Sequence, residues 1–317
     1  MTTGQTGLAQ SNGSKYTNGE GISQQTTGRT SLVDLTPKPT VIGVIIPRFD
    51  SPSTVLTLKG IDCVAQDKGY QVLVANCHQK VDQEVAAIYR FAHEKVAGII
   101  WLAGQITSQH LDALDESGLP AVVVGQEHER LYSVVHDDYQ AGYEMGQAIV
   151  GLGHQHVTYI GVPEEDRAVG RIRKAGVING LREAGARGVE VLESDFSSES
   201  AVAKGEQLLA EHRRTVLIAA TDTMAIGLLK AASNLGVSVP NQVCIAGFGG
   251  YDLGNYVQPT LSTVQYQFQK AGATAMVTLA NLINEVATPR VTLMPVKLKL
   301  RQSTTQVRKM KKLKSFL

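Results

Sequence analysis

The chain has 317 residues, 43% of them hydrophobic and 19% charged, and its formal net charge is +1 at pH 7. This length and composition suit one large globular unit or two medium-sized lobes, and the near-neutral charge excludes a strong positive field that would attract nucleic acid or a membrane surface. Cys63, Cys77 and Cys244 are an odd number of cysteines without CxxC spacing, so we expect reduced thiols and neither a disulfide framework nor a metal site. We find no apolar run of roughly 18 residues and no secretory signal, and therefore predict a cytoplasmic protein with no membrane partner.

The two ends differ in composition from the rest of the chain. Residues 1–40 are rich in Gly, Ser, Thr and Gln and carry few bulky apolar side chains. Such a segment buries too little apolar surface to offset its conformational entropy, so it is predicted to be disordered. Residues 304–317 form a basic tail, for which a solvated terminus is favoured over a site for an anionic partner.

Between these ends, runs typical of buried strands alternate with amphipathic helices. Strands are expected at residues 41–47, 71–77, 96–102, 121–125, 133–138, 156–162, 189–194, 215–220 and 243–249. Helices are expected at residues 55–68, 81–94, 108–116, 139–151, 170–184, 199–211, 222–235 and 268–284. Continuous apolar strands between such helices are typical of parallel sheets covered on both faces, so we predict an α/β fold of two doubly wound lobes. Ligands of such sheets bind beyond the carboxyl ends of the strands.

Several side chains suited to ligand binding follow the expected strands. Arg48, Phe49 and Asp50 come directly after the first strand, although an exposed loop with an aspartate cap would explain them equally well. Trp101 ends the third strand, either as a stacking platform for a sugar face or as lining of the lobe interface. Thr221 follows another buried strand, where capping of the next helix would account for its presence.

Basic residues gather at the start of the expected helix at residues 170–184. Arg171 and Arg173 lie there with Arg167 and Lys174, and cations at this end oppose the helix macrodipole. A bound anion would remove that conflict, and guanidinium groups suit hydroxyl pairs, carboxylates and phosphates. Ion pairing with residues 164–166 remains the alternative.

Asp222 and the segment CIAGFGGYD are further candidates. Asp222 stands at the start of a helix and could be only a cap. The segment places Phe248, Gly249 and Tyr251 after a strand, but it lacks the full GxGxxG spacing, so no dinucleotide cofactor is expected. We find no GxSxG elbow, Walker A loop, HExxH motif or Cys/His ligand set, which predicts a protein without catalytic residues, metal or cofactor.

Six segments in chain order resemble the effector-binding core of the LacI/GalR family of bacterial transcription regulators. They are VIGVIIPRFDSP, VAGIIWL, VVHDDYQAGYEMGQAIVGLGHQHVTYIGV, GRIRKAG, AATDTMAIGLLKA and GFGGYDLGNYVQPTLSTV. Within the family, IPRFDS, PEEDRAVGRIRKAG and GFGGYD are most similar to sucrose-operon repressors of Gram-positive bacteria, with trehalose-operon repressors next. The resemblance implies periplasmic-binding-protein-like lobes, which we place at residues 41–161 plus 266–289 and at residues 162–265 plus 290–303.

The resemblance also implies a ligand and roles for the candidate residues. A small sugar or sugar phosphate is expected between the lobes, with Arg173 and Asp222 as ligands of sugar hydroxyls and Thr221 beside them. Arg48 matches an arginine that trehalose-type repressors use on a sugar phosphate, and Arg171 is its natural companion. Phe49, Asp50, Trp101, Phe248 and Tyr251 are expected around the same cleft, and Gly249 replaces an acidic or amide ligand of many relatives.

The expected partners follow from the same family. Its members form homodimers and bind operator DNA through a helix-turn-helix, for which residues 1–40 contain no recognisable sequence. We therefore expect a sensor core in this chain, with operator DNA as a partner only if a helix-turn-helix is present in the full-length protein. An extracytoplasmic sugar-binding protein of a transport system is the alternative, and a sugar-handling enzyme is a third possibility.

Overall fold

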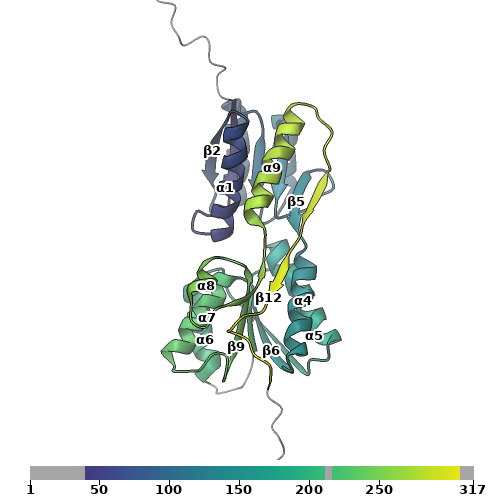
Figure 1. The fold of residues 1–317 in the computed structure, drawn as a ribbon. Coiled ribbons are helices and arrows are strands. Elements are labelled where there is room, and N and C mark those ends of the chain that lie inside the picture. The colour runs from purple at the N-terminus through teal and green to yellow at the C-terminus, as the bar shows by residue number, and fades with distance from the viewer. Residues whose placement is uncertain (1–39, 211–215, 308–317) are drawn as a thin grey trace, which may run out of the picture. The chain divides into compact units, whose positions relative to one another are not determined.

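Two sheets organise the part of the chain that the computed structural model describes, residues 40–210 and 216–307 (Figure 1). Each sheet has six strands, and only β12 pairs in the antiparallel direction. The predicted α/β fold with two doubly wound, largely parallel lobes is confirmed. The predictions for residues 1–39 and 308–317 fall outside the described residues.

In the N-terminal sheet, β1 pairs with the edge strand β2 on one side and with β3 on the other. In spatial order, its strands are β11 (Val291–Met294), β5 (Tyr132–His136), β4 (Ala121–Val124), β3 (Ile99–Leu102), β1 (Thr40–Ile46) and β2 (Tyr70–Asn76). Its helices are α1 (Pro52–Asp67), α2 (Val81–His93), α3 (Ser108–Ser117) and α9 (Phe268–Ile283).

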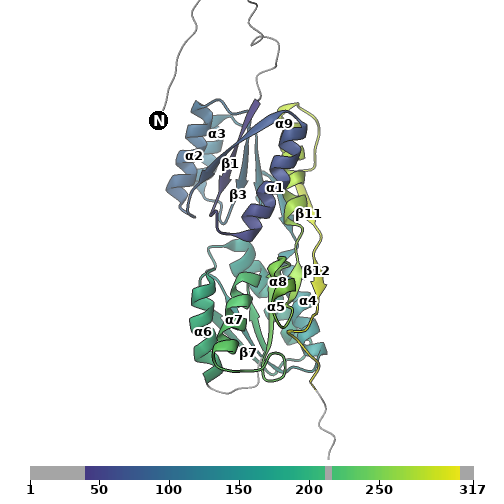
Figure 2. The ribbon, with the colours of Figure 1, turned by 60° about the vertical axis from the view of Figure 1, so that its left-hand side comes forward.

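Apolar side chains pack on both faces of this sheet. Ile42 and Val44 belong to a core shared with α1 and α9, whereas Ile45 belongs to a separate core shared with α2 and α3. This alternation follows from the two-residue period of a strand, and it explains why β1 reads as an unbroken apolar run. Glycine lets α1 and α9 approach closely, since a Cβ at Gly60 would lie 1.9 Å from the carbonyl oxygen of Gln269. The two helices run side by side in Figures 1 and 2.

The C-terminal sheet repeats the arrangement. In spatial order, its strands are β12 (Lys297–Lys299), β10 (Ser262–Gln265), β9 (Cys244–Gly249), β8 (Val216–Ala219), β6 (His156–Gly161) and β7 (Gly188–Glu193). Its helices are α4 (Asp138–Gly151), α5 (Lys174–Glu183), α6 (Ser198–Ala210), α7 (Asp222–Asn234) and the short α8 (Leu253–Tyr256). A π-helix, η2 (Arg167–Arg173), precedes α5, where an ordinary helix was expected. Within the described residues, no helix is long and apolar enough to span a bilayer.

The described chain crosses between the sheets three times, and two of the crossings differ from the prediction. The first follows β5 at His136, because β6 pairs with β7 and β8 in the C-terminal sheet and does not belong to the N-terminal lobe. The second lies between β10 and α9. The third follows Met294, because β11 pairs with β5 of the N-terminal sheet. The predicted boundaries at residues 161/162 and 289/290 are therefore wrong: hydrophobic periodicity shows that a strand is buried but not which sheet it joins.

Candidate functional site

A cavity of about 420 Å³ lies where the carboxyl ends of both parallel sheets meet. Its lining comes from the segments that follow β1, β3, β4 and β5 of one lobe and β6 to β10 of the other. Loops at these strand ends are where open α/β sheets bind ligands. We call this space the main cavity.

Arg173 forms the centre of the C-terminal wall. Its Nε and Nη2 atoms donate to Asp138 Oδ1 at 2.9 and 2.6 Å, and its Nη1 atom donates to the carbonyl of Ala220 at 2.7 Å. The guanidinium carbon lies 4.8 Å from the ring centroid of Tyr266 and 5.3 Å from that of Phe248. A guanidinium has five N–H donors, so two remain for a ligand. The Arg173 side chain is therefore buried beside two aromatic rings and keeps N–H donors for a ligand.

Asp138 connects this wall to the crossings between the lobes. It is the first residue of α4, immediately beyond the first crossing, and its Oδ1 also accepts the Tyr266 hydroxyl at 2.8 Å. Tyr266 lies in the second crossing, after β10. His136 ends β5 and its Nε2 accepts the backbone N–H of Gln267 at 3.2 Å. Burial lowers the pKa of His136 to about 4. Both crossings are thus tied to the residues around Arg173.

Asp222 shapes the loop after β9. Its carboxylate accepts the backbone N–H groups of Gly250 at 2.6 Å and Tyr251 at 3.1 Å, and the hydroxyl of Thr263 at 2.7 Å. Gly249 and Gly250 have φ angles of 145° and 72°, which L-residues with a side chain rarely adopt. Burial raises the pKa of Asp222 to about 6. Asp222 is fully buried behind the loop, so it places Gly249 and Tyr251 in the cavity wall without lining the wall itself.

Thr221 caps α7, since its Oγ1 accepts the backbone N–H of Met224 at 3.3 Å. The same residue lines the main cavity. The capping role is confirmed, and binding of a ligand by Thr221 stays a prediction that its place in the cavity wall allows.

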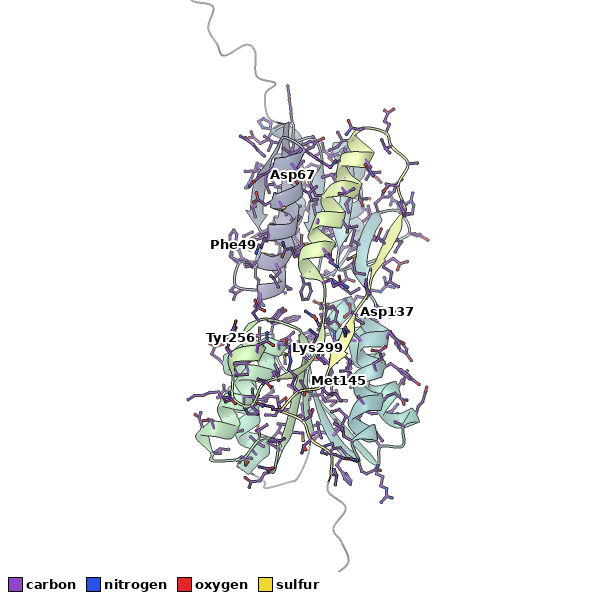
Figure 3. The ribbon with its side chains drawn as sticks, viewed as in Figure 1. Phe49, Asp67, Asp137, Met145, Tyr256 and Lys299 are labelled. Atoms are coloured by element: carbon purple, nitrogen blue, oxygen red, sulfur yellow. The ribbon has the colours of Figure 1, made fainter. Side chains whose placement is uncertain are left out.

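Arg48 enters the main cavity from the N-terminal lobe. Its Nε atom lies 3.3 Å from Asp50 Oδ1, and its guanidinium carbon lies 5.4 Å from the ring centroid of Phe196, which follows β7 in the other lobe. Arg48 and Asp50 line the cavity, but Phe49 does not. Phe49 is 58% exposed at the outer side of the loop before α1 (Figure 3), which corrects its expected place in the cleft.

Trp101 lies outside the main cavity, which corrects its expected place there. Its side chain is buried among the residues under α2 and α3, with its ring centroid 4.4 Å from that of His110. Successive residues of a strand point to opposite faces, so the position of a tryptophan at a strand end does not decide which way its ring points.

Arg171 is also outside the cavity, and it pairs with a neighbouring carboxylate, which was the alternative interpretation of the basic cluster. Its Nε atom lies 3.8 Å from Glu164 Oε2, and Lys174 donates to the same carboxylate. Lys174 lowers the pKa of Glu164. Arg171 is 62% exposed and therefore faces solvent.

Sequence reasoning missed several residues that line the cavity. Asp166 caps η2 by accepting the backbone N–H of Val169 at 2.9 Å, and burial raises its pKa to about 6. Asp138 is the last residue of an expected strand, and this signal was available but not used. The other missed lining residues with polar or aromatic side chains include Gln126, His136, Phe196, Tyr266 and Phe268. No group of three or more His, Cys, Asp or Glu side chains in the described chain is arranged to hold a metal.

Comparison with known proteins agrees with this geometry. Residues 147–304 match the family described as a periplasmic binding protein-like domain. The chain is 34% identical over 243 residues to the sucrose operon repressor of Staphylococcus xylosus, covering 77% of this chain and 76% of that protein. The chain belongs to the LacI/GalR family of transcriptional regulators.

Two other relatives of this LacI/GalR-family chain extend the similarity. It is 29% identical over 273 residues to catabolite control protein A of Priestia megaterium, covering 84% of this chain and 82% of that protein. The crystal structure of the transcription regulator CcpA of Lactococcus lactis matches with a TM-score of 0.77 at 27% identity, covering 84% of this chain and all of that chain. The match includes both lobes and therefore the cavity between them.

Proposed function

We propose that this chain is the sugar-sensing core of a cytoplasmic transcription regulator, in which a small sugar or sugar phosphate between the lobes controls operator binding. The observation that carries the proposal is that Arg48 and Arg173, from opposite lobes, line one cavity. Similarity to a sucrose operon repressor supports a sugar as the effector. The proposal includes no catalytic step and no cofactor.

The lining of the main cavity suits a sugar. A sugar ring presents hydroxyl groups at its edge and C–H groups on its faces. Arg173 has two N–H donors for hydroxyl oxygens, and Thr221 and Gln126 add groups that both donate and accept. The rings of Tyr266 and Phe248 supply apolar surface next to these polar groups. A few placed polar groups among aromatic side chains are typical of small-molecule sites.

A ligand in this cavity would act on the arrangement of the lobes. It shifts the arrangement only by the difference between its affinities for the open and closed forms. A ligand bound to Arg173 would affect the hydrogen bonds that join Arg173 to Asp138 and Asp138 to Tyr266, and these two partners lie in or beside two of the three crossings. A ligand that also contacts Arg48 would connect the N-terminal lobe to the C-terminal lobe. In a homodimer, which we also propose, a change of lobe arrangement alters the spacing of two DNA-binding heads on an operator.

A thermal unfolding assay with a panel of sugars tests the proposal. Glucose, fructose, sucrose and trehalose, with their available phosphates, are added to the purified chain, and calorimetric titration gives the affinity of each compound that raises Tm. A ligand at 100 times its Kd stabilises the folded state by about 2.7 kcal/mol, which is readily seen as a rise in Tm. A panel in which no compound raises Tm would overturn the proposal.

A pair of variants locates the ligand. Arg48→Gln should reduce the rise in Tm, because it removes a cavity-lining cation that is about one-third exposed and only loosely paired with Asp50. Phe49→Ala is the matched control, since this neighbouring side chain lies outside the cavity. An equal loss of the ligand effect in both variants would remove Arg48 from the site.

A further inference from the structure

A hydrogen bond joins the two lobes at the rim of the main cavity. Arg167, the first residue of η2 in the C-terminal lobe, donates from Nη1 to the carbonyl oxygen of Glu127 at 3.1 Å, and Glu127 follows β4 in the N-terminal lobe. Neither residue lines the main cavity, although their chain neighbours Gln126 and Asp166 do. The bond therefore connects the lobes from outside the space in which we propose that an effector binds.

The donor end of this bond is held in place by the start of η2. Asp166 caps η2 by accepting the backbone N–H of Val169 at 2.9 Å, and its own carbonyl accepts the backbone N–H of Gly170 at 2.8 Å. A Cβ at Gly170 would lie 2.0 Å from the carbonyl oxygen of Pro163, so this turn packs closely against the segment after β6. The backbone of Arg167 is thus fixed relative to the C-terminal sheet, and its side chain reaches to the other lobe.

The acceptor end is anchored in the N-terminal lobe. Gln126 is 4% exposed, and its Nε2 donates to the carbonyl of Gly104 at 2.9 Å. On the other side of Glu127, the backbone N–H of Leu131 donates to the carbonyl of His128 at 3.0 Å and closes a turn. The Glu127 carbonyl is therefore held between two anchored residues, so separation of the lobes stretches its bond to the guanidinium.

Arg167 differs in its partners from two other cations of the basic cluster. Arg171 and Lys174 both pair with Glu164, which belongs to their own lobe. No carboxylate of the described residues forms an ion pair with Arg167, and the hydrogen bond to the other lobe engages its guanidinium. A charged donor gives a stronger hydrogen bond than a neutral one, so this bond favours the arrangement in which the lobes are close.

A second contact between the lobes shows why the position of Arg167 matters. The Arg48 guanidinium lies 5.4 Å from the ring centroid of Phe196, and both side chains line the main cavity. A ligand that enters the cavity would compete for this contact. The bond from Arg167 to Glu127 lies outside the cavity and is open to no such competition.

We infer that Arg167 is an interlobe latch: by holding the Glu127 carbonyl, it favours the closed arrangement of the lobes with or without an effector, and it thereby raises the apparent affinity for the effector. The first part concerns the lobes alone, and the second part rests on the proposed function. A ligand that binds only the closed arrangement has an apparent Kd equal to its intrinsic Kd divided by the closed fraction. A latch that raises this fraction lowers the apparent Kd without touching the ligand.

Distances between spin labels test the latch without any ligand. Cys63, the exposed native cysteine, is replaced by serine, and the labels are attached to cysteines introduced by Asp112→Cys on α3 and Ala203→Cys on α6, two exposed positions in opposite lobes. Pulsed electron paramagnetic resonance of labelled protein diluted with unlabelled protein gives the distances within one chain. Arg167→Met keeps the aliphatic part of the side chain and removes the donor, so it should raise the ratio of open to closed populations by about threefold to tenfold.

Two control variants separate the latch from a general effect of charge. Arg171→Met removes an exposed cation of the same η2 whose partner lies in its own lobe, and Glu127→Gln keeps the carbonyl that accepts the bond. Both should give the distance distribution of the wild type. An unchanged distribution in Arg167→Met, or an equal opening in either control, overturns the inference.

Calorimetric titration with glucose, fructose, sucrose and trehalose tests the effect on affinity. Each compound that binds the wild type should bind Arg167→Met about threefold more weakly and Arg171→Met with an unchanged Kd. An unchanged Kd in Arg167→Met, despite a larger open population, overturns the second part of the inference. If none of the four sugars binds any of the proteins, this second part falls, and the label distances still decide whether Arg167 is a latch.

Discussion

The pairing of Arg173 with Asp138 leads to the most informative stability prediction. Arg173→Met removes the hydrogen bonds of 2.9 and 2.6 Å to Asp138 and the bond of 2.7 Å to the carbonyl of Ala220. Asp138 is 8% exposed, and among the described residues its carboxylate would retain only the Tyr266 hydroxyl, at 2.8 Å. Leaving one partner of a buried pair uncompensated costs about 3–5 kcal/mol, so we expect a loss of this size in the free energy of unfolding.

A double variant measures the interaction between Arg173 and Asp138 separately from the contacts that each residue makes with its other neighbours. Asp138→Asn alone leaves the Arg173 guanidinium buried without its counter-charge, so it should also cost about 3 kcal/mol. Arg173→Met with Asp138→Asn removes both charges together. We expect the double variant to lose less than the sum of the single losses, with an interaction of about 2–3 kcal/mol.

Urea unfolding followed by circular dichroism measures all four proteins of this cycle. Losses that simply add would refute the argument that the two side chains stabilise each other. A loss below about 1 kcal/mol for Arg173→Met would show that the cation is not buried as the structure has it. The double variant, folded but without the guanidinium, should also lose the rise in Tm caused by the effector.

Two further outcomes follow from the crossings and the loop after β9. The pKa of His136 is lowered from 6.5 to about 4, so the contribution of the neutral imidazole to the free energy of unfolding is complete above pH 6.5 and is lost as the pH falls through 4. Between pH 7 and pH 4, the wild type should therefore lose about 3 kcal/mol more of its free energy of unfolding than His136→Gln. Urea unfolding at both pH values measures this difference. Gly250→Ala should destabilise by more than 2 kcal/mol, because φ is 72° and a Cβ would lie 2.7 Å from the Cα of Gln265. Gly236→Ala, with φ of 66° and open space around the Cβ position, should cost only about 1 kcal/mol, and equal Tm shifts for the two variants would contradict the steric argument.

Positions at the ends of strands were the most successful guide to the site. Arg48 and Asp50 follow β1, Thr221 follows β8, and Tyr251 follows β9, and all four line the main cavity. Parallel strands of one sheet end at the same edge, so a polar residue directly after a buried strand reaches that edge whatever the details of packing.

The direction of a side chain at such an edge was the weakest part of the prediction. Phe49 and Trp101 have suitable types and positions, but one points to solvent and the other into the core. Arg171 and Arg173 are only two residues apart, but residues two apart in a helix lie on different faces, and only Arg173 lines the cavity. Asp166 was expected only as a possible ion-pair partner, but it caps η2 and lines the main cavity.

The sequence by itself determined the alternation of strands and helices, the two parallel lobes and the sheet edges at which the main cavity lies, because periodicity and strand ends are local properties of the chain. Only the tertiary structure decided where the chain crosses between the lobes, and how Asp138 and Tyr266 hold Arg173 in the wall of the main cavity. These features depend on pairs of residues distant in sequence, such as Arg173 and Asp138, or Tyr266 and Asp138, which no local pattern brings together.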